Sequence, residues 1–413
     1  MKLRNSTIVK ACFVFFVLSS YSMFYLIKIP GVTHYNYSIT AAVGIGLSLI
    51  MLFSKQEYTW NKISTLYRIY LLSTVVSVLV LSFFTIVRYN GQPLMDTFRV
   101  MGQYLLVIWA IPIVYLFNNS KSEYPVLDII NLVSLIWCIM AIAHAIYYRM
   151  SGGILFQNIE EVNTGVRNEL SRIPVGSFAN FSILYSFYRF YSAKDGNKLF
   201  FLVSMLILGA ANIFVLQSRA ATVAVVLSIA AMFFFDNTKK YSFYFKLIVI
   251  CVGGLFIVFT GVIQKYLETE YHKYNISVYA REYAFNYYFS IFLKNPLVGF
   301  GFVKSIGYES IIRGPRGIAS IDDVGFVGQL AVLGIFAVAI IVLAYFYLFK
   351  QVLEVKKFSG SFNPLMIGVL VYILATSITF IVFDQQRIAL LPVAIALFEF
   401  YTQKARDAIR LNV

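Results

Sequence analysis

Residues 67–87 read YRIYLLSTVVSVLVLSFFTIV, and after Arg68 this run contains no charged residue. A helix needs roughly 20 apolar residues to cross a bilayer core of about 30 Å, so one such run is long enough to span a membrane. The pattern recurs along the chain: of 413 residues 60% are hydrophobic and 13% are charged, and the mean hydropathy is +0.76. A water-soluble core cannot bury that much apolar surface, so the sequence predicts a polytopic membrane protein.

Twelve apolar runs are predicted to span the membrane, at 8–27, 37–54, 67–87, 100–117, 126–148, 176–191, 199–216, 219–235, 246–263, 324–349, 363–382 and 386–402. Backbone groups find no water inside a bilayer, so these runs must be helices and the fold all-α. The first run lacks a small-residue cleavage pattern, and we interpret it as an uncleaved span. Around Gln217 two runs meet with almost no loop between them. The sequence is compatible there with either a sharp hairpin or one long kinked helix.

The distribution of Lys and Arg indicates the orientation. With both termini in the cytoplasm, the inner segments hold 14 Lys and 5 Arg and the outer segments 5 Lys and 10 Arg, which together make the 34 cations of the chain. The net charge of +15 is therefore mostly a topology signal, and we infer no nucleic-acid partner from it. Arginine binds phosphate bidentately. The outer surface therefore favours an anionic ligand, although arginines that only reach out from helix ends would give the same count.

The predicted organisation has three parts. Residues 1–263 hold nine spans and an external loop at 149–175, residues 264–323 form one long external loop, and residues 324–413 hold three spans and a cytoplasmic tail. Within the long loop, residues 277–294 are predicted to form an aromatic-rich helix that lies on or slightly in the outer leaflet.

The long loop holds most of the candidate site residues. Arg281 and Glu282 are neighbours on the predicted helix, so only one of them can face a central cavity. The next stretch, residues 295–302, reads NPLVGFGF, and its glycines allow close approach of the backbone to a ligand. Arg313 and Arg316 come next, in a basic hairpin, and Asp322-Asp323-Val324-Gly325 leads into the next span.

Several kinds of site find no support in the sequence. The three cysteines, Cys12, Cys138 and Cys251, all lie in apolar runs, so they indicate no disulfide framework or metal site. The three histidines show no ligand spacing, and there is no phosphate-binding loop or dinucleotide fingerprint.

The order of these features resembles the bacterial O-antigen polymerase and O-antigen ligase superfamily. The resemblance covers the whole topology, and its specific motifs lie within about 217–335: Ser218-Arg219, the helix with Arg281, the turn 295–301, and the Asp-Val-Gly stretch followed by Leu333-Gly334-Ile335. It implies the membrane-embedded glycosyltransferase (GT-C-like) fold in the bacterial inner membrane, with the long loop in the periplasm.

The resemblance also implies an activity. Ligases of the superfamily typically have a His-Asn pair where the long loop meets the following span, whereas this chain has Asp322-Asp323 there, and its loop histidine, His272, lies at the other end. This favours the polymerase branch, which joins undecaprenyl-diphosphate-linked oligosaccharide repeat units at the periplasmic face. The alternatives are an O-antigen ligase and a lipid-linked oligosaccharide flippase. Expected partners are the bilayer, a chain-length regulator and a flippase.

The leaving group of such a transfer is a lipid diphosphate, whose growing negative charge is stabilised by cationic donors. Six arginines are candidates to bind it: Arg172, Arg219, Arg281, Arg313, Arg316 and Arg387. Arg219, Arg281 and Arg387 are preferred, and Arg281 is also a candidate catalytic residue. Arg219 at a helix end and Arg387 paired with Asp384 are equally compatible with purely structural roles.

The acceptor hydroxyl must lose a proton, which a carboxylate can accept. Asp322 and Asp323 are the first candidates, and Glu282 is the second. The alternative for the aspartates is a helix cap at Val324. Because the chain has no Asp-X-Asp motif, we expect catalysis without a metal or other cofactor. The predicted spans show no obvious buried ion pairs, which disfavours a transporter.

Overall fold

The computed structural model describes residues 2–21, 36–53, 63–156, 166–167, 170–171, 176–192, 197–236, 271–304, 307–378, 381–384 and 387–411. Within these ranges the chain is helical, apart from short antiparallel pairing of β1 (Val166–Arg167) with β2 (Leu170–Ser171). The all-α prediction is confirmed at that level.

The first half of the chain forms α1 (Lys2–Ser20), α3 (Asn36–Phe53), α5 (Thr65–Arg88), α6 (Leu94–Leu105), η1 (Leu106–Trp109), α7 (Ala110–Ser120), α8 (Tyr124–Ser151) and α9 (Gly176–Ser192). The second half forms α10 (Lys198–Ala210), η3 (Ala211–Leu216), α11 (Arg219–Phe235), α14 (Tyr271–Lys294), α15 (Glu309–Arg313), η4 (Ile321–Asp323), α16 (Gly325–Leu333), η5 (Val338–Val342), α17 (Leu343–Ser359), α18 (Pro364–Thr376) and α19 (Leu390–Leu411).

In the described part of the chain, five continuous helical stretches are long and apolar enough to cross a membrane: Thr65–Arg88, Leu94–Ser120, Tyr124–Ser151, Lys198–Leu216 and Val338–Ser359. The second of these is the central one, because 83% of its apolar window is buried, against 33–44% in the other four. Four shorter apolar helices accompany them within the same described ranges. The predicted span at 246–263 lies outside the described residues, and the count of twelve stays a prediction.

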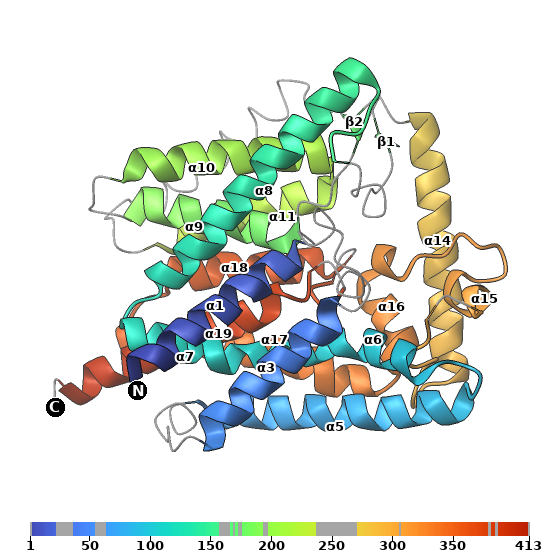
Figure 1. Cartoon of the computed structure of the whole chain (residues 1–413), viewed down its shortest axis with the longest axis horizontal. Helices are drawn as coiled ribbons and strands as arrows, with labels where there is room; N and C mark the ends of the chain where they lie inside the picture. Colours follow the sequence, from blue (N-terminus) through green and yellow to red (C-terminus); the bar gives the residue numbers. More distant parts are fainter. Residues whose placement is uncertain are drawn as a thin grey trace.

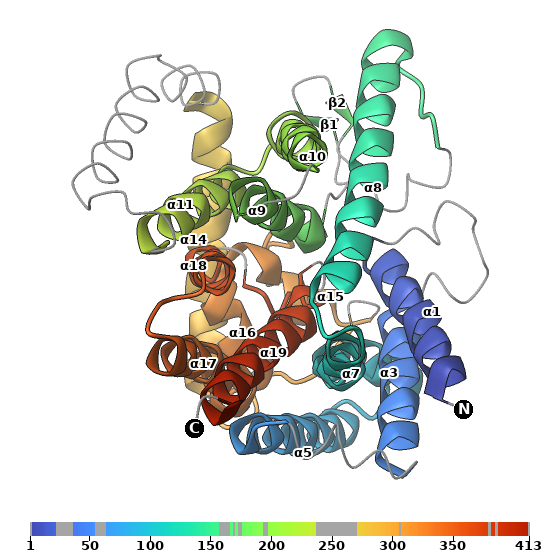
Figure 2. The same cartoon turned by 90° about the vertical axis from the view of Figure 1, so that its left-hand side faces the viewer.

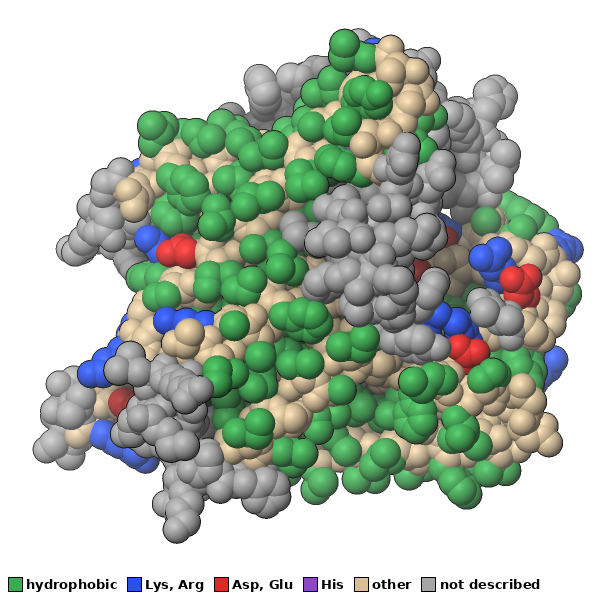
Figure 3. Space-filling view, viewed as in Figure 1, with side chains coloured by type: hydrophobic (Ala, Val, Ile, Leu, Met, Phe, Trp, Pro, Cys, Tyr) green, Lys and Arg blue, Asp and Glu red, His purple; other side chains and the backbone are tan. Residues whose placement is uncertain are grey.

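Helix α5 shows why this bundle belongs in lipid. Its large apolar side chains Leu72, Leu79 and Phe83 are exposed, whereas the polar Thr74 and Ser77 are buried. A water-soluble helix has the opposite arrangement. Across the face in Figure 3, hydrophobic side chains cover the middle of the bundle, and charged side chains gather toward its left and right ends. This face therefore has an apolar middle between two ends that carry charged side chains.

Most of the helices run along the long axis of the molecule, but α14 crosses one end of the bundle at a steep angle (Figure 1). The two termini lie at the opposite end. A view turned by 90° looks more nearly along the bundle and shows α7 and α19 side by side within it (Figure 2). The loop helix predicted for 277–294 is confirmed, and it begins earlier, at Tyr271. Its crossing direction suits a helix that lies in the plane of a membrane surface.

Two predicted features change in the structure. The span predicted for 324–349 is wrong as one helix, because α16 ends at Leu333 and Gly334 takes a left-handed φ of 56°. The junction at Gln217 is a sharp turn. Gln217 is left-handed with a φ of 51°, and Ser218 begins a new helix by accepting a hydrogen bond from the backbone N–H of Ala221.

Candidate functional site

A cavity of about 560 Å³ opens at the end of the bundle that α14 crosses. Its wall comes from α6, the segment after α14, α15 and the turn next to it, η4, α16 and the turn before α19. The charged groups on this wall are Arg99, Lys304, Arg313, Asp322 and Asp384. Such a volume is typical of small-molecule sites, and the mixture of cations and carboxylates suits an anionic substrate that undergoes proton transfer.

The turn at residues 295–301 joins the loop to α16. The backbone N–H groups of Phe300 and Gly301 donate to the carbonyls of Ala331 and Val332 at 2.8 and 3.0 Å. These carbonyls belong to the last turn of α16, where a helix has no internal donors for them. The loop therefore caps the broken end of this helix.

The glycines of that turn pack closely against other parts of the protein, and Gly301 also lines the cavity, so the expectation that they let a ligand approach the backbone stays a prediction. A Cβ on Gly299 would lie 2.2 Å from the carbonyl oxygen of Ala331, and one on Gly301 would lie 2.3 Å from the Thr85 hydroxyl oxygen. A Cβ on Gly334 would likewise lie 2.5 Å from the carbonyl oxygen of Leu297. The two stretches 295–301 and 333–335, which are separate in the sequence, thus form one joint.

The segment after this turn is fixed to α5 and α6. The Thr85 hydroxyl accepts from the Phe302 N–H at 2.9 Å, and Gln92 bonds both the Phe302 carbonyl at 3.0 Å and the Lys304 N–H at 3.1 Å. The Lys304 ammonium pairs with Asp96 of α6 at 3.0 Å. These contacts place the Lys304 side chain on the cavity wall.

Asp322 stands in the 3₁₀ turn η4, just before α16. The capping interpretation is wrong, because the N-cap residue of α16 is Val324 and no side chain caps that end. Helix α16 begins at Gly325, whose left-handed backbone packs so closely that a Cβ would lie 2.4 Å from the carbonyl oxygen of Ser377. Asp322 is therefore left to face the cavity, while Asp323 is half-buried beside it and does not line the wall.

Asp322 and Asp384 form the carboxyl pair of this site. Asp384 is 1% exposed, bonds to Asp322, and forms an ion pair with the Arg387 guanidinium. The pairing of Arg387 with Asp384 that the sequence suggested is confirmed. Two backbone N–H groups, those of Arg387 and Ile388, donate to the Asp384 carbonyl at 2.8 and 2.9 Å, which holds this turn in place.

The Asp322 side chain is exposed to the open space of the cavity, which lies between α6, α16 and the turn before α19. Burial and then the neighbouring Asp384 carboxyl raise the pKa of Asp322 to about 8, despite the opposing effect of Arg387. A carboxylate disfavoured by burial and by a like charge gains basicity. Asp322 is thus suited to accept a proton near neutral pH, which a carboxylate of ordinary pKa does poorly.

The structure separates the predicted arginines. Arg313 lines the cavity. Arg316, three residues later, lies over the Tyr283 ring at 5.2 Å and donates to the Tyr279 hydroxyl, outside the cavity wall. Arg281 and Glu282 are both exposed on α14 and do not line the cavity either. Arg172 lies outside the described residues, and so does the side chain of Arg219, whose backbone begins α11.

The sequence indicated Asp384 only as a partner of Arg387, and it did not indicate four other members of the site: Arg99, Lys304 and the hydrogen-bonded pair Tyr104 and Gln329, joined at 2.7 Å. The sequence could have indicated Arg99, because this arginine directly precedes the predicted span at 100–117, on its predicted external side. Nothing in the sequence indicated that the other residues belong to the site, because their positions in the cavity depend on how segments distant in the sequence pack together. Among the residues that the structure describes, no cluster of three or more His, Cys, Asp or Glu could hold a metal.

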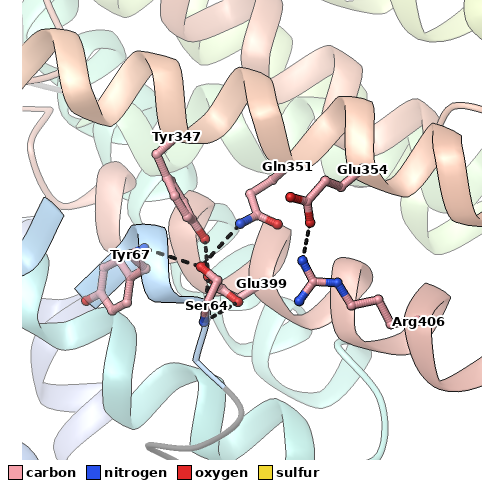
Figure 4. A network of polar contacts seen from close by, with 7 residues as sticks. All are labelled: Ser64, Tyr67, Tyr347, Gln351, Glu354, Glu399 and Arg406. Atoms are coloured by element: carbon pink, nitrogen blue, oxygen red, sulfur yellow. Dashed lines mark hydrogen bonds and ion pairs between the residues drawn. The ribbon is translucent and has the colours of Figure 1, made fainter. Parts of the chain in front are cut away.

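A different buried carboxylate lies at the other end of α5 (Figure 4). Glu399 of α19 is 1% exposed and accepts hydrogen bonds from the Ser64 backbone and hydroxyl and, at 2.8 Å, from the Tyr347 hydroxyl. Gln351 donates to the Ser64 hydroxyl at 3.4 Å. This network locks α5, α17 and α19 together.

The spans α8 and α9 share a partly exposed ion pair, in which the Arg189 side chain is 11% exposed and the Asp128 side chain 48% exposed, so it does not contradict the expectation that the spans lack buried ion pairs. Arg189 of α9 lies 3.7 Å from Asp128 of α8, and its guanidinium stacks on the Tyr124 ring at 4.1 Å. The Tyr185 hydroxyl bridges the two charged groups. This pair lies near helix ends, where it joins α8 to α9.

The chain matches no protein-family model and no curated protein sequence. The activity proposed for it therefore rests on its residues, its cavity and the resemblance of its motifs to the O-antigen polymerase and ligase superfamily.

Proposed function

We propose that this protein polymerises lipid-linked oligosaccharide repeat units, of O-antigen or a related surface polysaccharide, at the periplasmic face of the bacterial inner membrane. Undecaprenyl diphosphate is the leaving group. The observation that supports this most is a single cavity, at the polar end of an apolar bundle, that puts Asp322 together with cationic side chains.

In the proposed reaction the hydroxyl oxygen of the acceptor sugar attacks the anomeric carbon of the donor. The bond from that carbon to the diphosphate oxygen breaks, and its electron pair leaves with the diphosphate. Asp322 accepts the proton of the attacking hydroxyl. Asp322 replaces the undivided aspartate pair of the sequence analysis as the proposed base, since Asp323 does not line the cavity and Glu282 lies on the exposed side of α14.

The cations have a separate role. Arg99, Lys304 and Arg313 line the cavity, and there they stabilise the negative charge that grows on the diphosphate. Arg387 acts through Asp384, with which it is paired. Arg281, Arg219 and Arg172 stay candidates from the resemblance, as contacts to the lipid diphosphate outside the cavity wall, whereas Arg316 is engaged with Tyr279 and Tyr283 and is not given that role.

The proposed orientation has a direct test. Reporters fused after Gly317 should respond as periplasmic and those fused after Lys356 as cytoplasmic, because short Lys-rich segments are retained inside. The reverse result for Gly317 would remove the cavity from the compartment in which the proposed reaction occurs.

The activity is tested with the purified chain in lipid nanodiscs and a defined oligosaccharide on undecaprenyl diphosphate. We expect a ladder of longer lipid-linked products together with free undecaprenyl diphosphate. Transfer only to an added lipid A-core acceptor would instead indicate a ligase. Movement of the substrate across vesicle membranes without any new glycosidic bond would indicate a flippase, and either result would overturn the proposal.

A further inference from the structure

Asp384 is the least accessible charged group on the cavity wall, and the proposed transfer does not use it directly. It is 1% exposed, and it belongs to the turn between α18 and α19 rather than to the long loop. Its carboxyl group meets two different partners, the Asp322 carboxyl group and the Arg387 guanidinium. A buried carboxyl between an acid and a base decides how a proton is distributed between them.

We propose that Asp384 is a positioning residue for Asp322. The two carboxyl groups share one proton, and Arg387 keeps the negative charge on Asp384, so that Asp322 is the member that gains and loses the proton. The catalytic role of Asp384 rests on the proposed function. The sharing of a proton between the two carboxyl groups does not, because it can be measured without substrate.

The geometry supports this division of roles. Asp384 is the member in contact with the arginine, whose side chain is 18% exposed. Asp322 is the member that opens to the cavity, where a hydroxyl substrate can reach it. Two like charges in contact cannot both ionise easily, so below about pH 8 the paired Asp384 retains the charge and Asp322 holds the proton, and above it Asp322 is free to accept one.

Other ionisable groups surround Asp322 from each neighbouring element. Asp323 adjoins it on η4, Tyr104 faces it from α6 and Tyr288 from α14, and Arg313 lines the same cavity. Burial raises the pKa of Tyr288 further above its usual range, so this phenol stays neutral when Asp322 titrates. Asp384 and Arg387 are therefore the groups whose removal changes the titration of Asp322 most directly.

The test is an infrared titration of the purified full chain in nanodiscs, without substrate, which follows the band of protonated carboxyl groups. Asp322→Asn identifies the Asp322 band by its loss, and the midpoint in the unaltered chain should lie near pH 8. Asp384→Asn should move that midpoint lower by roughly one pH unit or more, because a neighbouring negative charge is removed. Arg387→Gln should move it higher.

Glu354→Gln is the matched control, since Glu354 pairs with Arg406 at the opposite end of the bundle, and it should leave the midpoint unchanged. An unchanged midpoint in Asp384→Asn would overturn the inference, even for a chain that makes normal polymer. If that variant does not fold, an unchanged midpoint in Arg387→Gln overturns it equally. Shifted midpoints in a chain that forms no glycosidic bond would retain the inference and reject the proposed function.

Discussion

The two ends of α5 lie next to buried carboxylates that have opposite surroundings. At one end, Glu399 receives hydrogen bonds from Ser64 and Tyr347. At the other end, Arg88 donates to the Gly299 carbonyl at 3.0 Å, next to the cavity where Asp322 faces Asp384. A carboxylate surrounded by donors stabilises structure, whereas two carboxyls that face each other beside open space are suited to proton transfer.

The largest expected effect is a loss of stability at Gly334, where residues 295–301 and 333–335 pack together next to the cavity. Gly334→Ala adds a Cβ only 2.5 Å from the Leu297 carbonyl oxygen, at a φ of 56° that favours glycine. We expect a loss of about 3 to 6 kcal/mol in the free energy of unfolding from strain and overlap together. Thermal unfolding in detergent measures it.

The matched control is Gly360→Ala at the other end of the bundle. Gly360 also has a left-handed φ, of 73°, but nothing lies within 4 Å of an added Cβ. It should lose only about 1 to 2 kcal/mol. Equal losses in the two variants would contradict the joint described here.

A second comparison separates two arginines that the sequence could not distinguish. Arg313→Ala removes a cation from the cavity wall and should lower polymer formation about a hundredfold to a thousandfold. Arg316→Ala removes a guanidinium that stacks on Tyr283 outside the cavity, so turnover should stay within about twofold, since exposed cation–π pairs contribute only about 0.5–1 kcal/mol. Turnover by equal amounts of the two purified variants tests this comparison. Equally large losses of turnover would contradict it and indicate that the anion site extends toward α14.

Glu399→Gln tests the other side of the comparison. The substitution weakens charge-assisted hydrogen bonds to Ser64 and Tyr347, so the free energy of unfolding should fall by about 1.5 to 3 kcal/mol. Turnover per folded molecule should stay unchanged. Unfolding and turnover are measured on the same preparation, and a large loss of turnover without loss of stability would give this network a role in catalysis.

The pH dependence of the activity should come from the ionisation of Asp322 in the cavity. The base must be ionised to accept a proton, and the pKa of Asp322 is raised to about 8, so activity should rise with pH through that value. Between pH 9 and pH 7 the rate should fall about tenfold as the carboxylate becomes protonated. A rate that is flat over this range would exclude Asp322 as the base.

Hydropathy predicted where α5, α8 and α10 run, because lipid imposes a local requirement on each span. It did not predict the break at Gly334, since residues 324–342 are apolar almost throughout and the break depends on carbonyls of the distant turn 295–301. Asp384 was noticed only as a partner of Arg387, because its contact with Asp322 comes from the folded bundle. The exposure of both Arg281 and Glu282 likewise depends on how α14 packs on α16.

The most direct test of the account is the turnover of Asp322→Asn with a lipid-linked oligosaccharide, measured beside Glu399→Gln at equal amounts of folded protein. We predict that Asp322→Asn lowers turnover by about a hundredfold to ten-thousandfold while it still binds the substrate, as expected for loss of a general base. We predict that Glu399→Gln keeps normal turnover. Normal polymer formation by Asp322→Asn would contradict the account and place the chemistry outside this cavity.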